Sequence, residues 1–292
     1  MLEGKEKQNT VKKNIYYLFA MMMVAMLSVG FTSCGEDNDD SFPNDPQWPG
    51  DSGNTGGDGD TPPPYDFSVK NDDGITIYYN IINGNEAAVN SISPSDYPNF
   101  YYSVVIPSSV TYNGKVYNVV AIGYLAFSGC IGLTSVVIPN GIRYIGRGAF
   151  YNCEWLSSIT IPNSVTTIDL SAFRGCNALT SLTIPNSVTT IGSSAFEGCS
   201  SLTSVTIPNN LASIDNYVFK DCRSLTSINI PNSVMSIGVS AFNGCEWLTS
   251  VSIPSGVTYI GDSAFEGCKE LTSVTIPNSV AFIYNSTFIR CI

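Results

Sequence analysis

The sequence predicts a β-rich solenoid, a stack of about eight 23-residue repeats whose equivalent strands pair in a parallel sheet. Phenylalanine, cysteine and the dipeptide Ile-Pro each recur with a constant interval of 23 residues over the C-terminal half of the chain. The phenylalanines are Phe127, Phe150, Phe173, Phe196, Phe219, Phe242, Phe265 and Phe288. Within each interval, apolar and hydroxyl side chains alternate with the period of a half-buried strand. A constant period of this length indicates a repeat architecture in which each unit packs on its neighbours.

Residues 1–33 have the composition of a secretory signal. Four lysines between positions 5 and 13 precede the apolar run Leu18–Phe31, which is shorter than the roughly 20 residues that a membrane-spanning helix needs. The run ends in Phe31-Thr32-Ser33-Cys34, which resembles the lipobox of bacterial lipoproteins in its looser Bacteroidetes form. The resemblance implies that Cys34 receives a lipid and becomes the mature N-terminus. The alternative is a cleaved signal followed by an incidental cysteine.

Residues 34–64 are expected to form a disordered acidic tether rich in proline and glycine. Such a composition cannot bury enough apolar surface to offset the entropy of the chain. The acidic run in residues 35–40 resembles the export signal that sends Bacteroidetes lipoproteins to the outer face of the outer membrane. That resemblance implies a lipid-anchored protein facing the cell exterior, whereas the alternative is a solvated linker.

Residues 65–122 are expected to form a β-rich cap, because the apolar end of a solenoid must be covered. Segments 75–82, 100–106 and 116–120 are rich in β-branched and aromatic residues and predict strands. Asn113-Gly114 is a strong signal for a hairpin turn. We therefore expect a β-hairpin cap that merges into the first repeat.

Residues 123–292 carry the repeats, and residues 179–199 illustrate one unit. Leu182 and Ile184 alternate with hydroxyl side chains, and Pro185 then ends strand pairing. The position of Gly192 holds glycine or aspartate in most repeats, which predicts a turn with positive φ. The residue before each cysteine predicts a second such turn, closing a short helical turn around Phe196. One unit cannot bury its apolar face alone, so stacking must stabilise the whole.

The pattern L-x-x-L-x-I-P-N-S-V-x-x-I-G-x-x-A-F-x-G-C over residues 65–292 resembles the BspA-like (Treponema pallidum-type) leucine-rich repeat family. The resemblance implies a leucine-rich repeat fold and a role in adhesion and host-matrix binding. The pattern departs from ordinary leucine-rich repeats, because the asparagine follows the last strand residue by two positions, as in Ile184 and Asn186. A buried asparagine ladder is therefore not expected.

Composition argues against several chemistries. The chain has no histidine, which removes the commonest general base and the commonest metal ligand. The net charge of −11 disfavours nucleic acid, whose phosphates require a surplus of lysine and arginine. No phosphate-binding loop, calcium loop or paired-carboxylate motif is present, and acids such as Glu197 and Glu266 are interpreted as a solvated face. We expect no enzymatic activity, no cofactor and no metal.

The eight cysteines at 23-residue intervals, from Cys130 to Cys291, are expected to be buried thiols. A disulfide ladder is the alternative for an exported protein. However, equivalent positions of stacked strands lie about 4.8 Å apart, whereas a disulfide needs Cβ atoms about 3.8 Å apart. Zinc would need four ligands at one point rather than one ligand in each layer.

Candidate binding residues come from exposed aromatic and hydroxyl positions. Trp155 and Trp247 share one variable repeat position, and each is either a binding anchor or incidental. Tyr259, Phe282 and Tyr284 cluster near the C-terminal end, where they either plug the stack or contact a partner. Outward rows of serine and threonine are suited to a glycan or protein ligand, but they are equally ordinary for solvent-facing strands.

These observations predict a surface-anchored protein-interaction or adhesion module without catalytic activity. Its partner would be a host or neighbouring-cell surface protein or glycan, with the membrane contacted through the lipid on Cys34. The alternative is a glycan-binding lipoprotein of an outer-membrane uptake system. At the C-terminal end Tyr284 and Arg290 replace the two turn residues. A degenerate cap, an open edge that pairs with another molecule and a truncated sequence all remain open there.

Overall fold

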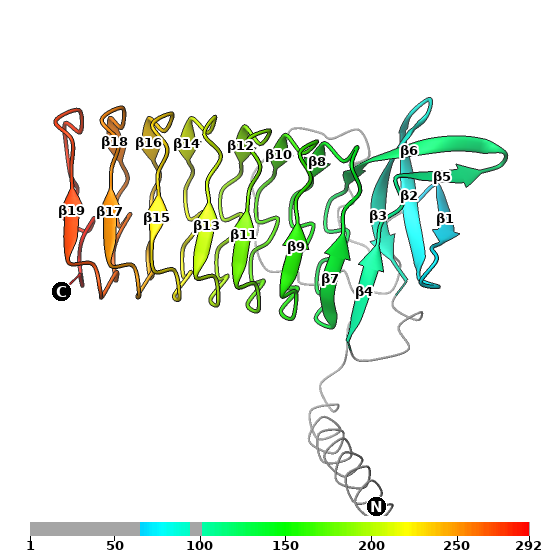
Figure 1. The fold of residues 1–292 in the computed structure, drawn as a ribbon, viewed down its shortest axis with the longest axis horizontal. Coiled ribbons are helices and arrows are strands. Elements are labelled where there is room, and N and C mark those ends of the chain that lie inside the picture. The colour runs from blue at the N-terminus through cyan, green and yellow to red at the C-terminus, as the bar shows by residue number, and fades with distance from the viewer. Residues whose placement is uncertain (1–64, 94–100, 292) are drawn as a thin grey trace, which may run out of the picture. The chain divides into compact units, whose positions relative to one another are not determined.

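The computed structural model describes residues 65–93 and 101–291. These residues form a β-solenoid of parallel strands and turns, with no helix among them (Figure 1). The predicted fold class is therefore confirmed. The predictions for residues 1–33 and 34–64, including lipidation of Cys34, lie outside the described residues.

The N-terminal cap is a twisted sheet that pairs directly with the stack. Its strands are β1 (Phe67–Lys70), β2 (Thr76–Asn83), β3 (Glu86–Ile92), β5 (Ser109–Tyr112) and β6 (Lys115–Ile122). β1, β2 and β3 are antiparallel neighbours, and β3 pairs in parallel with β6. β5 and β6 form the predicted hairpin, whose turn residues Asn113 and Gly114 have φ of 50° and 74°. Positive φ at both turn positions matches the twist of a hairpin.

One row of strands runs along the whole stack. It consists of β4 (Tyr102–Val105), β7 (Leu133–Val137), β9 (Ser158–Thr160), β11 (Ser181–Thr183), β13 (Ser204–Thr206), β15 (Ile228–Asn229), β17 (Ser250–Ser252) and β19 (Ser273–Thr275). Paired strands in the row are parallel, and residues at the same position of successive repeats lie opposite each other, as Ser181 and Ser204 do. The Ile-Pro pair follows each repeat strand, so the strands end where proline removes a donor.

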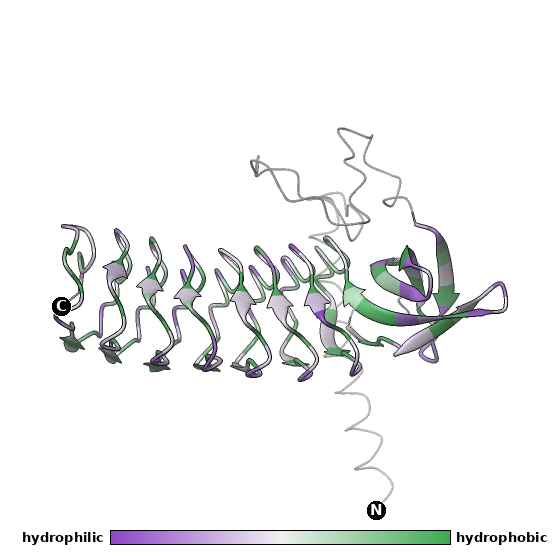
Figure 2. Cartoon of the chain, turned by 90° about the horizontal axis from the view of Figure 1, so that it is seen from above, coloured by the Kyte–Doolittle hydropathy of each residue, from purple (hydrophilic) through white to green (hydrophobic). Residues whose placement is uncertain are grey.

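A second row of two-residue strands lies on another side of each coil. It consists of β8 (Tyr144–Ile145), β10 (Thr167–Ile168), β12 (Thr190–Ile191), β14 (Ser213–Ile214), β16 (Ser236–Ile237) and β18 (Tyr259–Ile260). β6 of the cap begins this row by pairing in parallel with β8. In Figure 2 the cap strands show hydrophobic stretches interrupted by hydrophilic ones, whereas the repeat strands are mostly pale because they contain many serine and threonine residues.

The third side of each coil is a chain of turns rather than the predicted helical turn. Around Phe196, the N–H groups of Ala195 and Glu197 donate to carbonyls three residues earlier in the same coil. The N–H groups of Ser194, Phe196 and Gly198 instead donate to the next coil, at 2.8–3.0 Å. This alternation satisfies the backbone of the turn segment and binds adjacent coils together.

The prediction of positive φ at Gly192 is wrong, although the second predicted turn is confirmed. Positive φ occurs two residues later, at Ser194, and at the residue before each cysteine, as at Gly198. Gly192 is needed for a different reason: a Cβ there would lie 2.4 Å from the backbone nitrogen of Leu170 in the preceding coil. At Gly192 the need for glycine therefore comes from close approach between coils and not from a turn.

The interior is filled by equivalent side chains stacked in columns. Neighbouring rings of the phenylalanine column, Phe127 to Phe288, lie 5.1–5.6 Å apart with nearly parallel planes. The cysteines beside them are free thiols, and all except the half-buried Cys291 are buried, which confirms the expectation. Each thiol from Cys153 onward donates to a phenylalanine carbonyl in the preceding coil at 3.0–3.3 Å. Each of these carbonyls also accepts from the backbone N–H of the cysteine in its own coil, as Phe173 does from Cys176, so the thiol is its second donor and links adjacent coils.

Candidate ligand-binding surface

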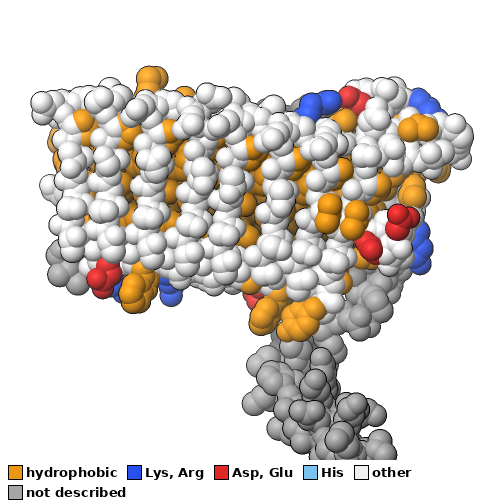
Figure 3. Space-filling model, in the orientation of Figure 1, with side chains coloured by type: hydrophobic (Ala, Val, Ile, Leu, Met, Phe, Trp, Pro, Cys, Tyr) orange, Lys and Arg blue, Asp and Glu red, His pale blue; other side chains and the backbone are white. Residues whose placement is uncertain are grey.

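The outer surface of the long strand row is wide and uncharged. From Leu133 to Pro139 and in the six equivalent segments up to 271–277, no residue is Lys, Arg, Asp or Glu. The side chains of β9 to β19 that point outward are serine, threonine and asparagine, and all of them are exposed. Figure 3 shows the middle of this face without charged side chains, which appear at its lower rim and near the cap. We call this surface the strand face.

A ladder of hydroxyl groups follows one edge of the strand face. Thr134 donates to the carbonyl of Tyr102 at 2.9 Å, and Ser157 donates to the carbonyl of Thr134 at 3.3 Å. The same contact recurs at Thr203, Thr226, Thr249 and Thr272. Because each of these hydroxyl hydrogens is already used, the oxygens present acceptor lone pairs to the solvent.

Trp155 lies at the rim next to this ladder and has an aromatic partner. Its ring and that of Tyr101 are 5.5 Å apart between centroids, with an interplanar angle of 73°. Both side chains are exposed, by 50% and 47%. Ile131, also exposed, lies in the coil between them. Figure 3 shows a hydrophobic patch on the lower rim of the strand face, near β7 and β9.

Sequence reasoning missed Tyr101 because it lies outside the 23-residue period. The N–H of Tyr102 donates to the carbonyl of Gly132 at 3.0 Å, which places Tyr101 level with Gly132 and Trp155. A signal was available: Ile106-Pro107 precedes Ile138-Pro139 by 32 residues, so the first coil has a longer offset. Pairing in the first coil follows this offset of 32 residues up to Ser103, which lies opposite Ser135. A one-residue bulge between Tyr102 and Ser103 reduces the offset to 31, so Tyr101 lies level with Gly132 at the rim.

Trp247 has the same repeat position as Trp155 but different surroundings. It is 60% exposed, and it stands between Ser224 and Glu270 of the adjacent coils. The neighbouring column holds an ion pair between Lys269 and Glu246, with 3.0 Å between nitrogen and oxygen. The structure therefore does not bring the two tryptophans together, since four coils separate them.

The three predicted C-terminal aromatic residues do contact one another. Tyr284 meets Phe282 with ring centroids 4.9 Å apart and meets Tyr259 at 6.4 Å, both edge to face. Phe282 is 64% exposed. This cluster lies on the side of the second strand row, because Tyr259 belongs to β18. It is therefore separate from the strand face.

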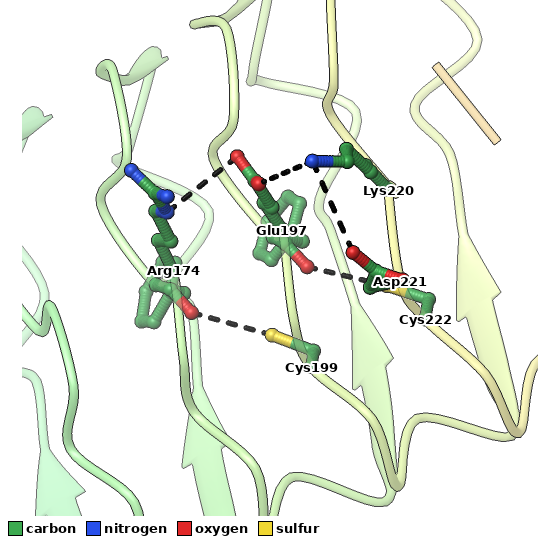
Figure 4. A network of polar contacts seen from close by, with 8 residues as sticks. Arg174, Glu197, Cys199, Lys220, Asp221 and Cys222 are labelled. Carbon is green, nitrogen blue, oxygen red and sulfur yellow. Dashed lines mark hydrogen bonds and ion pairs between the residues drawn. The ribbon is translucent and has the colours of Figure 1, made fainter. Parts of the chain in front are cut away.

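The acids of the turn side form paired contacts, so their interpretation as a solvated face is wrong for Glu197. This residue is only 9% exposed, and its carboxylate lies 3.5 Å from Arg174 Nε and 3.3 Å from Lys220 Nζ (Figure 4). The three residues come from three successive coils. Glu266 likewise accepts a hydrogen bond from Asn243 and pairs with Arg290. These contacts link coils, which is a structural role.

The buried thiols are held in their protonated form. Burial raises the pKa of Cys199 from 9.0 to about 12 and raises that of Cys176 and Cys222 well above 9.0. A thiol of this kind is a poor nucleophile at neutral pH. Within residues 65–93 and 101–291, no three His, Cys, Asp or Glu side chains are grouped so that they could hold a metal ion. That same part of the chain contains no apolar helix of membrane-spanning length.

The sequence matches the family model described as BspA type leucine-rich repeat region, over residues 98–222 and 166–292. No curated protein matches the chain. A leucine-rich repeat protein from Bacteroides ovatus is 31% identical, with 77% of this chain and 70% of that chain covered and a TM-score of 0.50.

Two further solved structures are similar to the chain. The T. pallidum leucine-rich repeat protein is 29% identical, with coverage of 73% and 80% and a TM-score of 0.46. A leucine-rich repeat protein from Eubacterium ventriosum is 24% identical, with coverage of 75% and 53% and a TM-score of 0.52. Together with the stacked coils and their phenylalanine and cysteine columns, the family match shows that this chain belongs to the BspA-type leucine-rich repeat family.

Proposed function

We propose that this protein is a non-catalytic adhesion module, anchored to the outer membrane by a lipid on Cys34 and facing the cell exterior. Its ligand is a protein or glycan on a host or neighbouring cell. The signal-like residues 1–33 and the acidic residues 35–40 support the anchoring and the display. Membership of a repeat family typical of interaction modules supports the binding.

The observation that carries the binding function is the strand face. Its seven equivalent coils, from β7 to β19, span roughly 29 Å at the usual strand spacing. Each coil is held by its neighbours through the turn ladder and the phenylalanine column, so the exposed side chains keep a fixed register. An extended surface of this kind is how stacked repeats bind large partners.

A pair of charge-matched variants tests this surface. Thr183→Glu with Thr206→Glu places two carboxylates on the strand face, whereas Thr189→Glu with Ala212→Glu places two on another side of the same coils; all four positions are exposed. Adhesion of cells that carry the first variant should fall strongly, because a partner that covers the strand face would have to bury the two carboxylates without a counter-charge. The second variant should adhere as the parent does. Equal adhesion by both variants would contradict the proposal.

The anchoring is tested on intact cells. External protease should remove residues 65–292, and a Cys34→Ser variant should no longer sediment with membranes, since it lacks the lipid attachment. Full protection of the protein from protease in intact cells would place it inside the envelope and refute the display.

A further inference from the structure

We propose that Tyr101 and Trp155 form a binding site for an uncharged glycan at the rim of the strand face. The proposal rests on the binding function proposed above and names the class of ligand. It depends on three features of the described residues: the geometry of the two rings, the absence of lysine and arginine from the strand face, and the acceptor character of the neighbouring hydroxyl ladder.

The contact between the two rings is possible because Gly132, in the layer between them, has no side chain. Tyr101 and Trp155 belong to coils two layers apart, about 10 Å between backbones at the usual strand spacing. The layer between them has Gly132 at the equivalent position, and the next layer beyond Trp155 has Ala178. The two rings come from the layers on either side of Gly132 and meet at 73°, and the small Ala178 follows Trp155 in the next layer, so both rings remain about half exposed. The result is an exposed aromatic corner.

An aromatic corner of this shape suits a pyranose ring. The axial C–H groups of a pyranose form an apolar face that packs on an aromatic face, while its equatorial hydroxyls point outward around the ring. Trp155 offers the larger face, and Tyr101 meets it nearly at a right angle. Aromatic rings carry a negative face that attracts such polarised C–H groups.

The hydroxyl ladder continues the site along the strand face. Thr134 and Ser157, in the coils of Gly132 and Trp155, use their hydrogens on backbone carbonyls. Their oxygens are left as acceptors, which complements the abundant donor hydroxyls of a glycan. Glu154 precedes Trp155 in the sequence, and Asn177 has the same repeat position as Glu154 in the next coil. Both side chains are exposed and add further acceptors.

The composition favours a glycan over a protein at this place. Protein interfaces are enriched in tyrosine, tryptophan, arginine and methionine and depleted in serine. The two rings alone therefore suit either class of ligand, and the glycan is favoured by the strand face beside them, which is rich in serine and threonine and carries no charge. An anionic glycan or a nucleic acid would need lysine or arginine, and the strand face has none. An uncharged polyhydroxylated chain is the ligand that matches both the corner and the face.

Trp247 provides a matched control within the same molecule. It has the same repeat position as Trp155 and is at least as exposed, but the layer two before it holds Ser201 in place of an aromatic partner, and the layer between holds Ser224 in place of Gly132. If an exposed tryptophan were sufficient, the two positions would contribute equally. The proposal requires the pair, so only Trp155 should matter.

The test is affinity electrophoresis of the full-length protein in gels that contain mannan, β-glucan, xyloglucan or starch, with heparin and polygalacturonate as anionic probes. At least one neutral polysaccharide should retard the protein. Trp155→Ala and Tyr101→Ala should weaken that binding by about tenfold or more, while Trp247→Ala should stay within about twofold. Raising the ionic strength from about 0.05 to about 0.5 M should leave the affinity unchanged, since no charges are screened.

A further variant separates loss of the site from loss of the fold. Gly132→Val keeps both aromatic rings but places a branched side chain where they meet, and it should weaken binding as Trp155→Ala does. Each variant should stay folded and unfold within about 6 °C of the parent protein, because the positions lie at the rim and the ring contact contributes only about 0.5–1.5 kcal/mol.

The other outcomes each overturn a stated part. Retardation by anionic probes only, or equal losses for Trp155→Ala and Trp247→Ala, would overturn the glycan site. Binding of a matrix protein with no retardation by any neutral polysaccharide would overturn the site and leave the adhesion function standing. If cells adhere equally with and without the protein, the adhesion function itself fails.

Discussion

The phenylalanine and cysteine columns inside the stack have the same residue in every layer, whereas the rim of the strand face changes between glycine, tryptophan, alanine, serine and glutamate. Phenylalanine fills its interior column without exception from Phe127 to Phe288. The rim position occupied by Trp155 reads Gly132, Trp155, Ala178, Ser201, Ser224, Trp247 and Glu270. An interior side chain must fit its equivalents above and below, so a change at one layer disturbs two others. A rim side chain meets solvent, and its identity is free to serve a ligand.

The largest expected effect concerns the interior cysteines at alkaline pH. Burial raises the pKa of Cys199 from 9.0 to about 12 and raises that of Cys245 well above 9.0. Above pH 9 the thiol ionises in the unfolded chain but stays protonated in the fold, so rising pH favours the unfolded chain. The stability is therefore complete below pH 9 and falls as the pH rises from 9 towards 12. Each such thiol should lower the free energy of unfolding by about 1.4 kcal/mol per pH unit in that range.

Urea unfolding at about pH 8 and about pH 10 measures this loss. Lysines and tyrosines also titrate there, so the Cys199→Ala variant is the control, and its stability should fall less steeply with pH than that of the parent. Parallel pH profiles for the two proteins would mean that Cys199 ionises as easily in the fold as outside it.

The next effect distinguishes a middle layer from the last described layer. Phe196→Ala should lower the free energy of unfolding by about 3–5 kcal/mol, because the ring is fully buried between two neighbouring rings. Phe288→Ala should cost clearly less, since Phe288 is half-buried and, among the described residues, stacks on Phe265 alone. Urea denaturation of both variants provides the comparison, and equal losses would show that stacking on both sides contributes nothing extra.

A smaller effect tests the close approach between coils. Gly192→Ala should destabilise by about 1–3 kcal/mol, because its Cβ would overlap the backbone nitrogen of Leu170 and force the coils apart. Gly84→Ala is the matched control, since nothing lies within 4 Å of a Cβ there and its φ is not positive. Thermal unfolding of the two variants should separate them, and a stability unchanged by Gly192→Ala would show that the coils accept a Cβ at this position without cost.

The same contrast explains how much of the fold could be predicted from the sequence. Columns that depend on a side chain, such as phenylalanine and cysteine, are visible as a period and were placed correctly. The role of Gly192 was misread, because a clash with the preceding coil cannot be seen in one repeat. β1 and β3 were also missed: β1 is short, and β3, with the sequence Glu-Ala-Ala-Val-Asn-Ser-Ile, is extended because it lies between β2 and β6.

The sequence predicted those residues of the candidate site that lie within the regular 23-residue repeats, and it missed the one that precedes them. Trp155 and Trp247 were singled out by their shared repeat position, but nothing in that position distinguishes them. The difference comes from Tyr101, which precedes the regular repeats and is brought to the rim by the longer offset of the first coil. Similarly, the burial of Glu197 depends on cations in two other coils, Arg174 and Lys220, which vary from layer to layer.

The smallest expected effect sharpens the comparison between interior and rim. Trp247→Ala should change the free energy of unfolding by less than about 0.5 kcal/mol, because the side chain is exposed and no aromatic residue in the described part of the chain stacks on it. Trp155→Ala should cost slightly more, about 0.5–1.5 kcal/mol, through loss of the edge-to-face contact with Tyr101. In a double-mutant cycle, Tyr101→Ala should therefore be coupled to Trp155→Ala and not to Trp247→Ala. Absence of that coupling would mean that the two rings do not hold each other in solution, and the rim would then have no preformed corner to offer a ligand.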